Sequence, residues 1–353
     1  MRCGRRRRAP PHAAARLVAV ARVNVGILGA GALGTLVAAS LASYATRHDS
    51  TSSVRLIVRD RETAEAIQRR GGLAVEEATL TGTARTSDAA RATDAAHETE
   101  AACVTDDIAS ALAGIDVLLV AVKTFATRDA VVPLRPHITP HVAVLSLQNG
   151  IAAASDLAYA LPGHTRIALA PTTEAAMLIE PGLVRRTARG RTHVGWVAGA
   201  SADDAPLRRY AAFATAAGLA TEVASPIEPV VWQKLVANAA INPTTALAGV
   251  VNGAILTDAA LRAGAAELAR EAAAVARACG IPIADDAAVA GAEAVMRATA
   301  ANRSSMLRDL ECGRRTEIDA ISGTIVRLAA EHGSIAVPAT ARVYDEVRAR
   351  ARP

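Results

Sequence analysis

Lysine occurs only twice in this 353-residue chain, at Lys123 and Lys234, whereas arginine occurs 37 times. Arginine has therefore replaced lysine at nearly every ordinary surface position. An ammonium group is a compact donor that can release its proton at attainable pH, whereas a guanidinium group is a flat fork that cannot. We therefore interpret the two lysines as site residues, placed where a proton or a compact positive charge is needed. The alternative is that both simply escaped the drift toward arginine.

The segment WQKLVANAAINP, residues 232–243, places Lys234 in a predicted helix with one polar face. Lys234, Asn238 and Asn242 are four residues apart and therefore share that face, and the residues between them are mostly apolar. Asparagine is unfavourable inside a helix, so the two amides indicate a function. Such a face would direct an ammonium group and two amides into an apolar cleft. Because Pro243 follows Asn242, we expect the helix to end or kink at this point.

A glycine loop, GAGALG, follows a buried strand pattern (VNVGIL) and precedes a helix pattern. In a first βαβ unit, glycines with this spacing permit a tight turn, a close backbone approach to a pyrophosphate and close packing of the helix on the strand. The helix N-terminus adds free N–H groups and the positive end of its dipole. The pattern alone is weak in a chain with 24 glycines, but its position predicts a dinucleotide site. That site comprises Gly29, Ala30, Gly31, Ala32, Leu33 and Gly34.

The end of the second predicted strand, residues 54–58, distinguishes between the two nicotinamide dinucleotides. An acid there binds the ribose 2′-hydroxyl of NAD, whereas an arginine accommodates the 2′-phosphate of NADP. Arg59 comes first and Asp60 second, so the sequence favours NADPH, with Arg59 as the residue that binds the 2′-phosphate. The alternative is an exposed ion pair between these two side chains.

Composition allows two domains with cores of small aliphatic side chains, because hydrophobic residues make up 51% of the chain and aromatic residues only 2%. The net charge of +5 comes from residues 1–22, which contain seven arginines and no acid. The remaining chain is near neutral, without the basic face that nucleic-acid binding needs, and no stretch could span a membrane. We expect residues 1–22 to be a disordered basic leader, because their apolar part is too short for a signal peptide and they are poor in serine for a transit peptide. The alternative is a translation start placed too far upstream.

Neither the cysteines nor the histidines predict a metal site. The four cysteines are far apart and form no C-x-x-C pair, which argues against a zinc site and a disulfide framework. This usage is typical of a reducing compartment, so we expect a cytoplasmic protein. His137 and His141 are four residues apart, but they lie in a proline-bounded loop without a third ligand nearby.

Strand and helix patterns alternate over residues 23–224, which predicts an α/β fold with a mostly parallel, doubly wound sheet. Lys123 follows one of its buried strands, DVLLVAV. Residues 225–353 have an almost purely helical, alanine-rich pattern, which predicts a second, all-α domain and a boundary near residue 224.

Shorter pieces of the first domain have weaker patterns. We expect one hairpin between residues 72–75 and 78–82 and another between residues 182–190 and 191–197. Residues 84–103 are rich in Ala, Thr and Asp without a clear period, so we expect a loop or a loose helical excursion there.

Several motifs, in this order, resemble the 2-dehydropantoate 2-reductase family, also called the ketopantoate reductases. They are the glycine loop, the strand-end lysine in VAVKTF, the tripeptide QNG, the W-x-K-x-x-x-N-x-x-x-N-P helix, the segment NRSSMLRD and the segment TEID. The similarity runs from about residue 23 to residue 345, and the combination is more specific than any single motif. The chain departs from the family in its basic leader, in residues 84–103 and in the residues just before Asn252.

The resemblance implies a Rossmann-type N-terminal domain and an all-helical C-terminal domain. It also implies NADPH-dependent reduction of 2-dehydropantoate to pantoate, a step of coenzyme A biosynthesis, in the cleft between them. Lys234 matches the catalytic lysine, and Glu317 is expected beside it. Residues that match positions near the nicotinamide end are Lys123, Asn149, Ala176 and Glu317. Residues that match substrate contacts are Asn149, Asn238, Asn242, Asn252, Asn302 and Ser305.

The implied chemistry agrees with these residue types. Hydride transfer to a ketone carbon leaves an alkoxide, which needs a donor that delivers a proton, and partial burial lowers the pKa of a lysine toward that task. Amides and a hydroxyl hold substrate oxygens without adding charge, and Glu317 could bind the substrate's hydroxyl or pair with Lys234. From the residues alone, Asn149 could equally be a turn residue, Ser305 a helix cap and Glu317 a surface acid.

Two other functions stay open at this stage. The chain could be a family member that reduces a different 2-oxo acid, because residues outside the motifs set the shape of the pocket. It could also be a regulator that senses NADPH without turnover, although a sensor has no need for a proton donor. The expected partner is a small-molecule 2-oxo acid, and a homodimer stays open.

Overall fold

The computed structural model describes residues 21–48, 51–77, 102–198, 203–333 and 335–351. All but the last two residues of the predicted leader, and most of the predicted loop at residues 84–103, lie outside these ranges. In the described residues, no helix is both long and apolar enough to cross a membrane.

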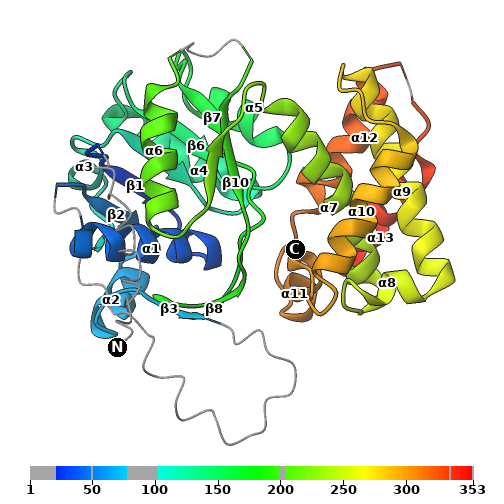
Figure 1. The fold of residues 1–353 in the computed structure, drawn as a ribbon, viewed down its shortest axis with the longest axis horizontal. Helices are drawn as coiled ribbons and strands as arrows, with labels where there is room; N and C mark the ends of the chain where they lie inside the picture. The colour runs from blue at the N-terminus through cyan, green and yellow to red at the C-terminus, as the bar shows by residue number, and fades with distance from the viewer. Residues whose placement is uncertain (1–20, 49–50, 78–101, 199–202, 334, 352–353) are drawn as a thin grey trace, which may run out of the picture.

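The amino-terminal half is built on an eight-stranded sheet (Figure 1). All neighbouring strands run parallel except β7 and β10, which are antiparallel, so the prediction of a mostly parallel sheet is confirmed. The strand order is β11 (Thr221–Val223), β10 (Thr192–Trp196), β7 (Ile167–Leu169), β6 (Ala143–Ser146), β5 (Val117–Val120), β1 (Val25–Leu28), β2 (Val54–Ile57) and β4 (Ala102–Thr105).

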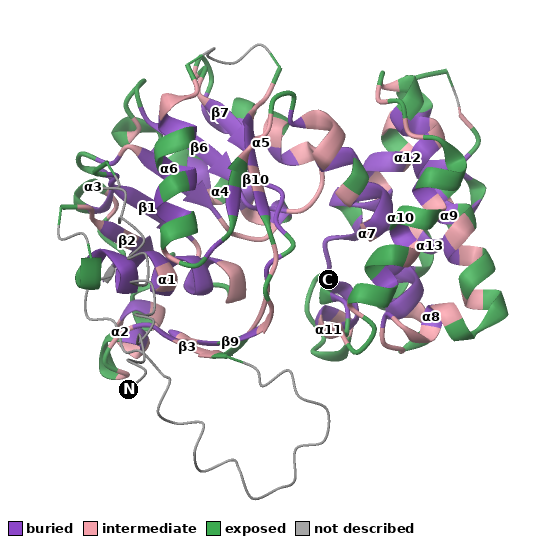
Figure 2. Cartoon of the chain, viewed as in Figure 1, coloured by how far each residue is buried: buried purple, intermediate pink, exposed green. Residues whose placement is uncertain are grey.

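Helices cover both faces of this sheet. Successive residues of a strand point to opposite faces, so each strand contributes side chains to the core on both sides. In β5, Val117 and Leu119 belong to the core cluster formed with α1 (Ala32–His48) and α6 (Ala205–Ala216). Leu118 and Val120 belong to the cluster on the other face, formed with α3 (Ile108–Leu112), α4 (Thr127–Val131) and α5 (Ala152–Ala160). All four of these β5 side chains are fully buried, and Figure 2 shows that the neighbouring strands β1 and β6 are buried as well. The sheet is therefore doubly wound.

The chain reverses its direction of travel across the sheet between β1 and β5. From β1 it passes to β2 and β4 on one side, through α2 (Arg61–Arg69), and then crosses to β5 and β6 on the other side. Ligands of doubly wound sheets bind in the crevice at the carboxyl ends of the strands beside such a switch point. A ligand site is therefore expected among the residues that follow β1, β2, β5 and β6.

A second, three-stranded sheet corrects one of the two predicted hairpins. Its order is β3 (Ala74–Glu77), β9 (Leu183–Ala188) and β8 (Ala175–Glu180). β9 pairs with β8 and β3, whereas β10 pairs with β7 and β11, so the hairpin expected between residues 182–190 and 191–197 is wrong. The turn that does form is at Pro181-Gly182, where Gly182 has a φ of +86°. The prediction missed β8 because its outer residues are exposed and show no buried alternation.

The other two local predictions in this region fall mostly on residues outside the described ranges. β3 pairs in parallel with β9, and residues 78–82, which were expected to form a hairpin with residues 72–75, lie outside those ranges. The last part of the expected loop at residues 84–103 belongs to β4, which extends the main sheet beside β2.

The carboxy-terminal half is helical, as predicted (Figure 1). The main sheet ends with β11 at Val223, and the helical half begins with α7 at Glu228. Its longest helix, α7, contacts α9, α10, α11 and α13, and a core rich in alanine lets these helices approach one another closely. The helices are α7 (Glu228–Ala248), α8 (Ala254–Thr257), α9 (Ala259–Ala278), α10 (Asp285–Ala298), α11 (Ser305–Glu311), α12 (Ser322–Glu331) and α13 (Pro338–Arg350).

The sequence predicted that the helix ends or kinks at Pro243, and α7 does not end there. A proline inside a helix loses one backbone hydrogen bond and crowds the preceding turn. Here Asn242, Pro243 and Thr244 are all buried, so packing against the neighbouring helices holds the helix together through this turn. The last residue of α7 is Ala248, and its cap, Gly249, has a φ of +70° and donates its N–H to the Thr245 carbonyl at 2.9 Å.

Candidate active site

The glycine loop after β1 has the geometry that a dinucleotide needs. Gly29 has a φ of +112°, and a Cβ atom there would lie 2.9 Å from the Val122 side chain. A Cβ on Gly34 would lie 2.0 Å from the Gly29 carbonyl oxygen, so α1 begins close against the loop. A Cβ on Gly31 would meet nothing within 4 Å, which leaves open space in front of the loop. Close packing behind the loop and open space in front of it fit a pyrophosphate at the start of α1.

Arg59 and Asp60 follow β2, and their side chains form no hydrogen bond or ion pair with each other. Asp60 is the N-cap of α2, where its Oδ1 accepts a hydrogen bond from the Thr63 N–H at 2.8 Å. This bond is the main reason that the pKa of Asp60 is lowered. Arg59 is exposed and makes no hydrogen bond or ion pair with any residue that the structure describes. The alternative of an Arg59–Asp60 ion pair therefore does not form.

Lys123 lies after β5 and joins the two halves of the molecule. Its Nζ donates to Asp309 Oδ2 of α11 at 2.7 Å and lies 3.7 Å from Glu317 Oε2. Both acids are buried, whereas the Lys123 side chain remains 41% exposed. The ammonium group is therefore fixed on one side and open on the other.

Glu317 is held by the turns after β5 and β6. Its Oε1 accepts from the Thr124 N–H at 3.0 Å, and its Oε2 accepts from Asn149 Nδ2 at 3.1 Å. Next to Asn149, Gly150 has a φ of +81°, and a Cβ there would lie 2.4 Å from the Ala320 carbonyl oxygen. Only glycine allows the turn after β6 to approach the Glu317 segment this closely. Glu317 is thus a buried acid rather than the surface acid that residue type alone allowed.

Lys234 lies in the second turn of α7, at the junction with this cluster. Burial lowers the pKa of its ammonium group to about 8, against the attraction of the Glu317 carboxylate, which raises the pKa. Lys234 forms no hydrogen bond or ion pair with any residue in the described ranges. A partly buried ammonium with a pKa near neutrality and free donors can deliver a proton to a bound molecule.

The polar residues predicted to contact substrate are grouped around α7 and α11. Asn238 and Asn242 follow Lys234 along α7, and Asn242 is buried. The Asn252 N–H donates to the Asn302 carbonyl at 2.9 Å, which joins the two asparagines. Asn252 Nδ2 donates to Thr299 Oγ1 at 2.9 Å, whereas its Oδ1 is buried without a hydrogen-bond partner in the described chain. That oxygen is an acceptor in need of a donor.

Two further predicted residues are less involved in the cluster. Ser305 is exposed at the start of α11, and the helix cap is its neighbour Ser304, which accepts from the Leu307 N–H and the Thr245 hydroxyl. Ala176 lies on β8 of the small sheet, opposite Arg186, and has no part in the hydrogen-bonded cluster.

The sequence did not single out three residues that hold the cluster in place. Asp309 pairs with Lys123, the backbone of Thr124 binds Glu317, and Gln148 is a buried connector. Gln148 Nε2 donates to the Val122 carbonyl at 2.8 Å and to Thr127 Oγ1 at 2.7 Å, which joins the ends of β5 and β6. Asp309 and Gln148 both stand inside the motifs noted above, so a search for polar partners within those motifs could have found them.

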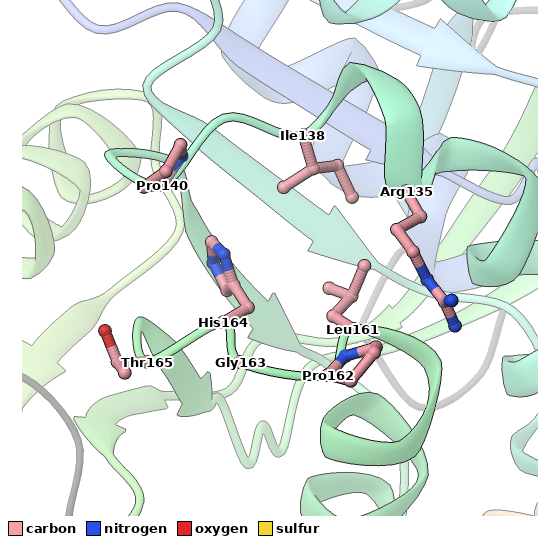
Figure 3. Close-up of a pocket in the computed structure, with 8 residues that line it drawn as sticks. All are labelled: Arg135, Ile138, Pro140, Leu161, Pro162, Gly163, His164 and Thr165. Atoms are coloured by element: carbon pink, nitrogen blue, oxygen red, sulfur yellow. The ribbon is translucent and has the colours of Figure 1, made fainter.

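A pocket of about 190 Å³ lies at the opposite end of the sheet (Figure 3). Its lining residues belong to the two segments that precede β6 and β7, at the amino ends of these strands. Arg135 Nε donates to the Ala160 carbonyl, and a ring nitrogen of His164 is bonded to the Val142 carbonyl. The pocket is therefore separate from the lysine cluster. In the described residues, no group of three or more His, Cys, Asp or Glu could hold a metal ion.

Comparison with known proteins agrees with this geometry. Residues 25–199 match the family described as "Ketopantoate reductase PanE/ApbA", and residues 226–351 match "Ketopantoate reductase PanE/ApbA C terminal". The chain belongs to the ketopantoate reductase family. Members of this family are oxidoreductases, and this protein is an enzyme of that class.

Individual members of the family are similar to this chain along most of their length. The 2-dehydropantoate 2-reductase of Halobacterium salinarum is 33% identical over 326 residues, covering 92% of this chain and 98% of the relative. That of Archaeoglobus fulgidus is 33% identical over 316 residues, covering 88% of this chain and 92% of the relative. The family structure from Ralstonia eutropha has a TM-score of 0.76 at 28% identity, covering 93% of this chain and 98% of that one.

A structure of D-mandelate dehydrogenase with NADH and anilino(oxo)acetate shares the fold. It has a TM-score of 0.77 at 21% identity and covers 93% of this chain and 98% of that one. At this identity the likeness concerns the fold alone.

Proposed function

We propose that this protein uses NADPH to reduce 2-dehydropantoate to pantoate, with Lys234 as the proton donor. The observation that carries the proposal is Lys234 itself, a partly buried ammonium with a pKa of about 8 and no protein partner in the described chain. It lies beside Glu317, which contacts the turns after β5 and β6 near the glycine loop. A proton donor beside a dinucleotide loop suits the reduction of a carbonyl group.

The residues present fit a dinucleotide at the carboxyl ends of the sheet strands. The loop from Gly29 to Gly34 would hold the pyrophosphate, because its backbone is accessible and α1 begins there. Arg59 would bind the 2′-phosphate, because Asp60 is committed to capping α2 and leaves the guanidinium group free. Lys123, Asn149 and Glu317 would contact the nicotinamide end. The cofactor supplies the hydride.

The substrate would lie against the polar face of α7. Amides from Asn238 and Asn242 can hold carboxylate and hydroxyl oxygens without adding charge near Lys234. The unpartnered Oδ1 of Asn252 would accept a hydrogen bond from the substrate's hydroxyl group, which satisfies a buried acceptor. Asn302, Ser305 and Ala176 complete the set of residues that we assign to the two ligands.

Lys234 completes the reaction by one proton transfer. When hydride reaches the ketone carbon, the carbonyl oxygen becomes an alkoxide, and the Lys234 ammonium gives it a proton. The lysine is left neutral and regains a proton from solvent before the next turnover. A pKa near 8 suits both steps at neutral pH, because it lies close to the operating pH.

The choice of 2-dehydropantoate rests on the relatives. The proteins from Halobacterium salinarum and Vibrio cholerae are both 2-dehydropantoate 2-reductases. The fold alone does not decide the substrate, because D-mandelate dehydrogenase shares it. Reduction of a different 2-oxo acid is therefore the second candidate, and a regulator without turnover is disfavoured by the presence of the free Lys234 donor.

Oxidation of NADPH with a panel of 2-oxo acids tests the proposal. We expect kcat/KM for 2-dehydropantoate to exceed that for pyruvate, 2-oxoisovalerate and phenylglyoxylate by at least about 10²-fold, because an enzyme selects by its contacts with hydroxyl and carboxylate groups. A higher kcat/KM for another acid would assign that acid as the substrate. An absence of turnover with all of them, despite NADPH binding, would favour the regulator.

Arg59→Ala should weaken the preference for NADPH. Loss of a charge-assisted contact to the 2′-phosphate is expected to raise KM for NADPH about tenfold or more and to leave KM for NADH nearly unchanged. The matched control is Arg61→Ala, two residues along, whose exposed guanidinium pairs with Glu65. If Arg59→Ala keeps the ratio of the two KM values, the assignment of the 2′-phosphate site is wrong.

A further inference from the structure

Asp309 accepts the one hydrogen bond that the Lys123 side chain makes within the described chain, across 186 residues of sequence. Asp309 is 4% exposed, and both its carboxylate oxygens are in use. Oδ2 accepts from Lys123 Nζ at 2.7 Å, and Oδ1 accepts from Arg314 Nε at 3.1 Å. The bond from Lys123 therefore matters on both sides, because a buried carboxylate without such a partner would be costly.

Lys123 lies close enough to the glycine loop for its ammonium group to contact a dinucleotide bound there. The residue before it, Val122, lies directly behind the glycine loop, since a Cβ on Gly29 would be 2.9 Å from its side chain. An ammonium group has three donors, and Asp309 occupies one of them. With 41% of the side chain exposed, donors remain for a ligand in the crevice at the switch point.

Glu317 competes with Asp309 for the same ammonium group. Glu317 Oε2 is 3.7 Å from Lys123 Nζ, outside hydrogen-bond range, and the bonds from Thr124 and Asn149 hold this carboxylate in place. Without Asp309, the only acid near Lys123 in the described structure is Glu317. Attraction between opposite charges would then draw the ammonium group toward Glu317 and away from its present position.

We propose that Asp309 is a positioning residue of the cofactor site, which holds the Lys123 ammonium where it contacts the bound dinucleotide. The inference rests on the proposed function, in which Lys123 is a cofactor contact. Asp309 itself touches neither cofactor nor substrate; it acts through Lys123, from α11 in the opposite half of the molecule.

The sign of the effect separates positioning from bulk electrostatics. NADPH is an anion, so removing a negative charge near its site should by simple Coulomb attraction strengthen binding. If Asp309 positions Lys123, its replacement weakens binding instead. The weakening requires Lys123, so it should disappear when Lys123 no longer has a charge.

A double-mutant cycle on NADPH binding tests this inference. The dissociation constant of NADPH, followed by its fluorescence, is measured for the wild-type protein, Asp309→Asn, Lys123→Met and the double variant. We expect Asp309→Asn alone to raise Kd about tenfold, and to leave Kd unchanged or lower it in the Lys123→Met background. Arg314→Ala is the matched control. The Arg314 side chain is 58% exposed and is the other partner of Asp309, so its removal should change Kd less than about twofold.

Three outcomes would overturn the inference: an unchanged or lower Kd in Asp309→Asn, an equal rise in Kd with and without Lys123, or a wild-type Kd in Lys123→Met. If Asp309→Asn does not fold, Asp309→Glu replaces it, since it keeps the charge but displaces the carboxylate, and the same Lys123-dependent rise is expected. Failure of the proposed function has a different signature. There the wild-type protein itself would not bind NADPH or would not oxidise it with any 2-oxo acid.

Discussion

Replacement of Lys234 by alanine is expected to lower kcat by about 10²–10⁴ while leaving NADPH binding nearly unchanged. The reason is that Lys234 is the free donor at the site, with a pKa lowered by burial to about 8. Without it, the alkoxide formed by hydride transfer has no positioned proton source. Steady-state kinetics with the preferred 2-oxo acid, together with a direct NADPH titration, would measure both quantities.

Lys234→Arg separates proton transfer from charge. Arginine keeps the positive charge but does not release a proton, so we expect a loss of kcat nearly as large as that in Lys234→Ala. Gln233→Ala, the exposed neighbour on the same helix, is the matched control and should retain kcat. A Lys234→Arg enzyme with nearly normal kcat would refute the proton-donor role and leave Lys234 a purely electrostatic one.

Glu317→Gln is expected to lower kcat/KM about 10²-fold at pH 8. The Glu317 carboxylate raises the pKa of Lys234, which burial lowers. When that attraction is removed, the pKa of Lys234 falls further, so less of the donor carries a proton at pH 8. The variant also puts an amide where the Thr124 N–H and Asn149 Nδ2 need an acceptor.

The pH dependence of Glu317→Gln distinguishes this cause from general damage. We expect the fall in activity with rising pH to begin at a lower pH than in the wild-type enzyme, so that activity recovers in part as the pH is lowered. Glu331→Gln is the matched control, because it removes the same charge from an exposed pair with Arg327. A uniform loss at every pH would show that Glu317 acts through structure rather than through the pKa of Lys234.

Features encoded in short stretches of sequence could be predicted. Lys234, Asn238 and Asn242 share a helix face because their spacing fits one helix, and α7 does form there. Gly29 has the positive φ of +112° that a tight turn needs, and a Cβ on Gly34 would lie 2.0 Å from the Gly29 carbonyl oxygen, five residues earlier. The alternation of strands and helices likewise predicted the parallel, doubly wound sheet.

Features that depend on distant partners could not be predicted. The Lys123–Asp309 bond joins residues 186 positions apart, and no local pattern signals it. β9 was assigned to the wrong partner because pairing depends on β8 and β3, of which β8 has an exposed pattern. Pro243 predicted an end or a kink of the helix, and α7 does not end there because packing against neighbouring helices holds it together. In each case tertiary packing decided the structure over the local signal.

The pH dependence of kcat/KM for the 2-oxo acid tests the central claim most directly, namely that Lys234 donates the proton. The donor must be protonated, so activity should be full below the pKa of Lys234 and fall as the pH rises through about 8. The same profile for Lys234→Ala should be low and should lack this fall. A wild-type kcat/KM that stays constant up to pH 10, or a fall near pH 8 that persists in Lys234→Ala, would contradict the account.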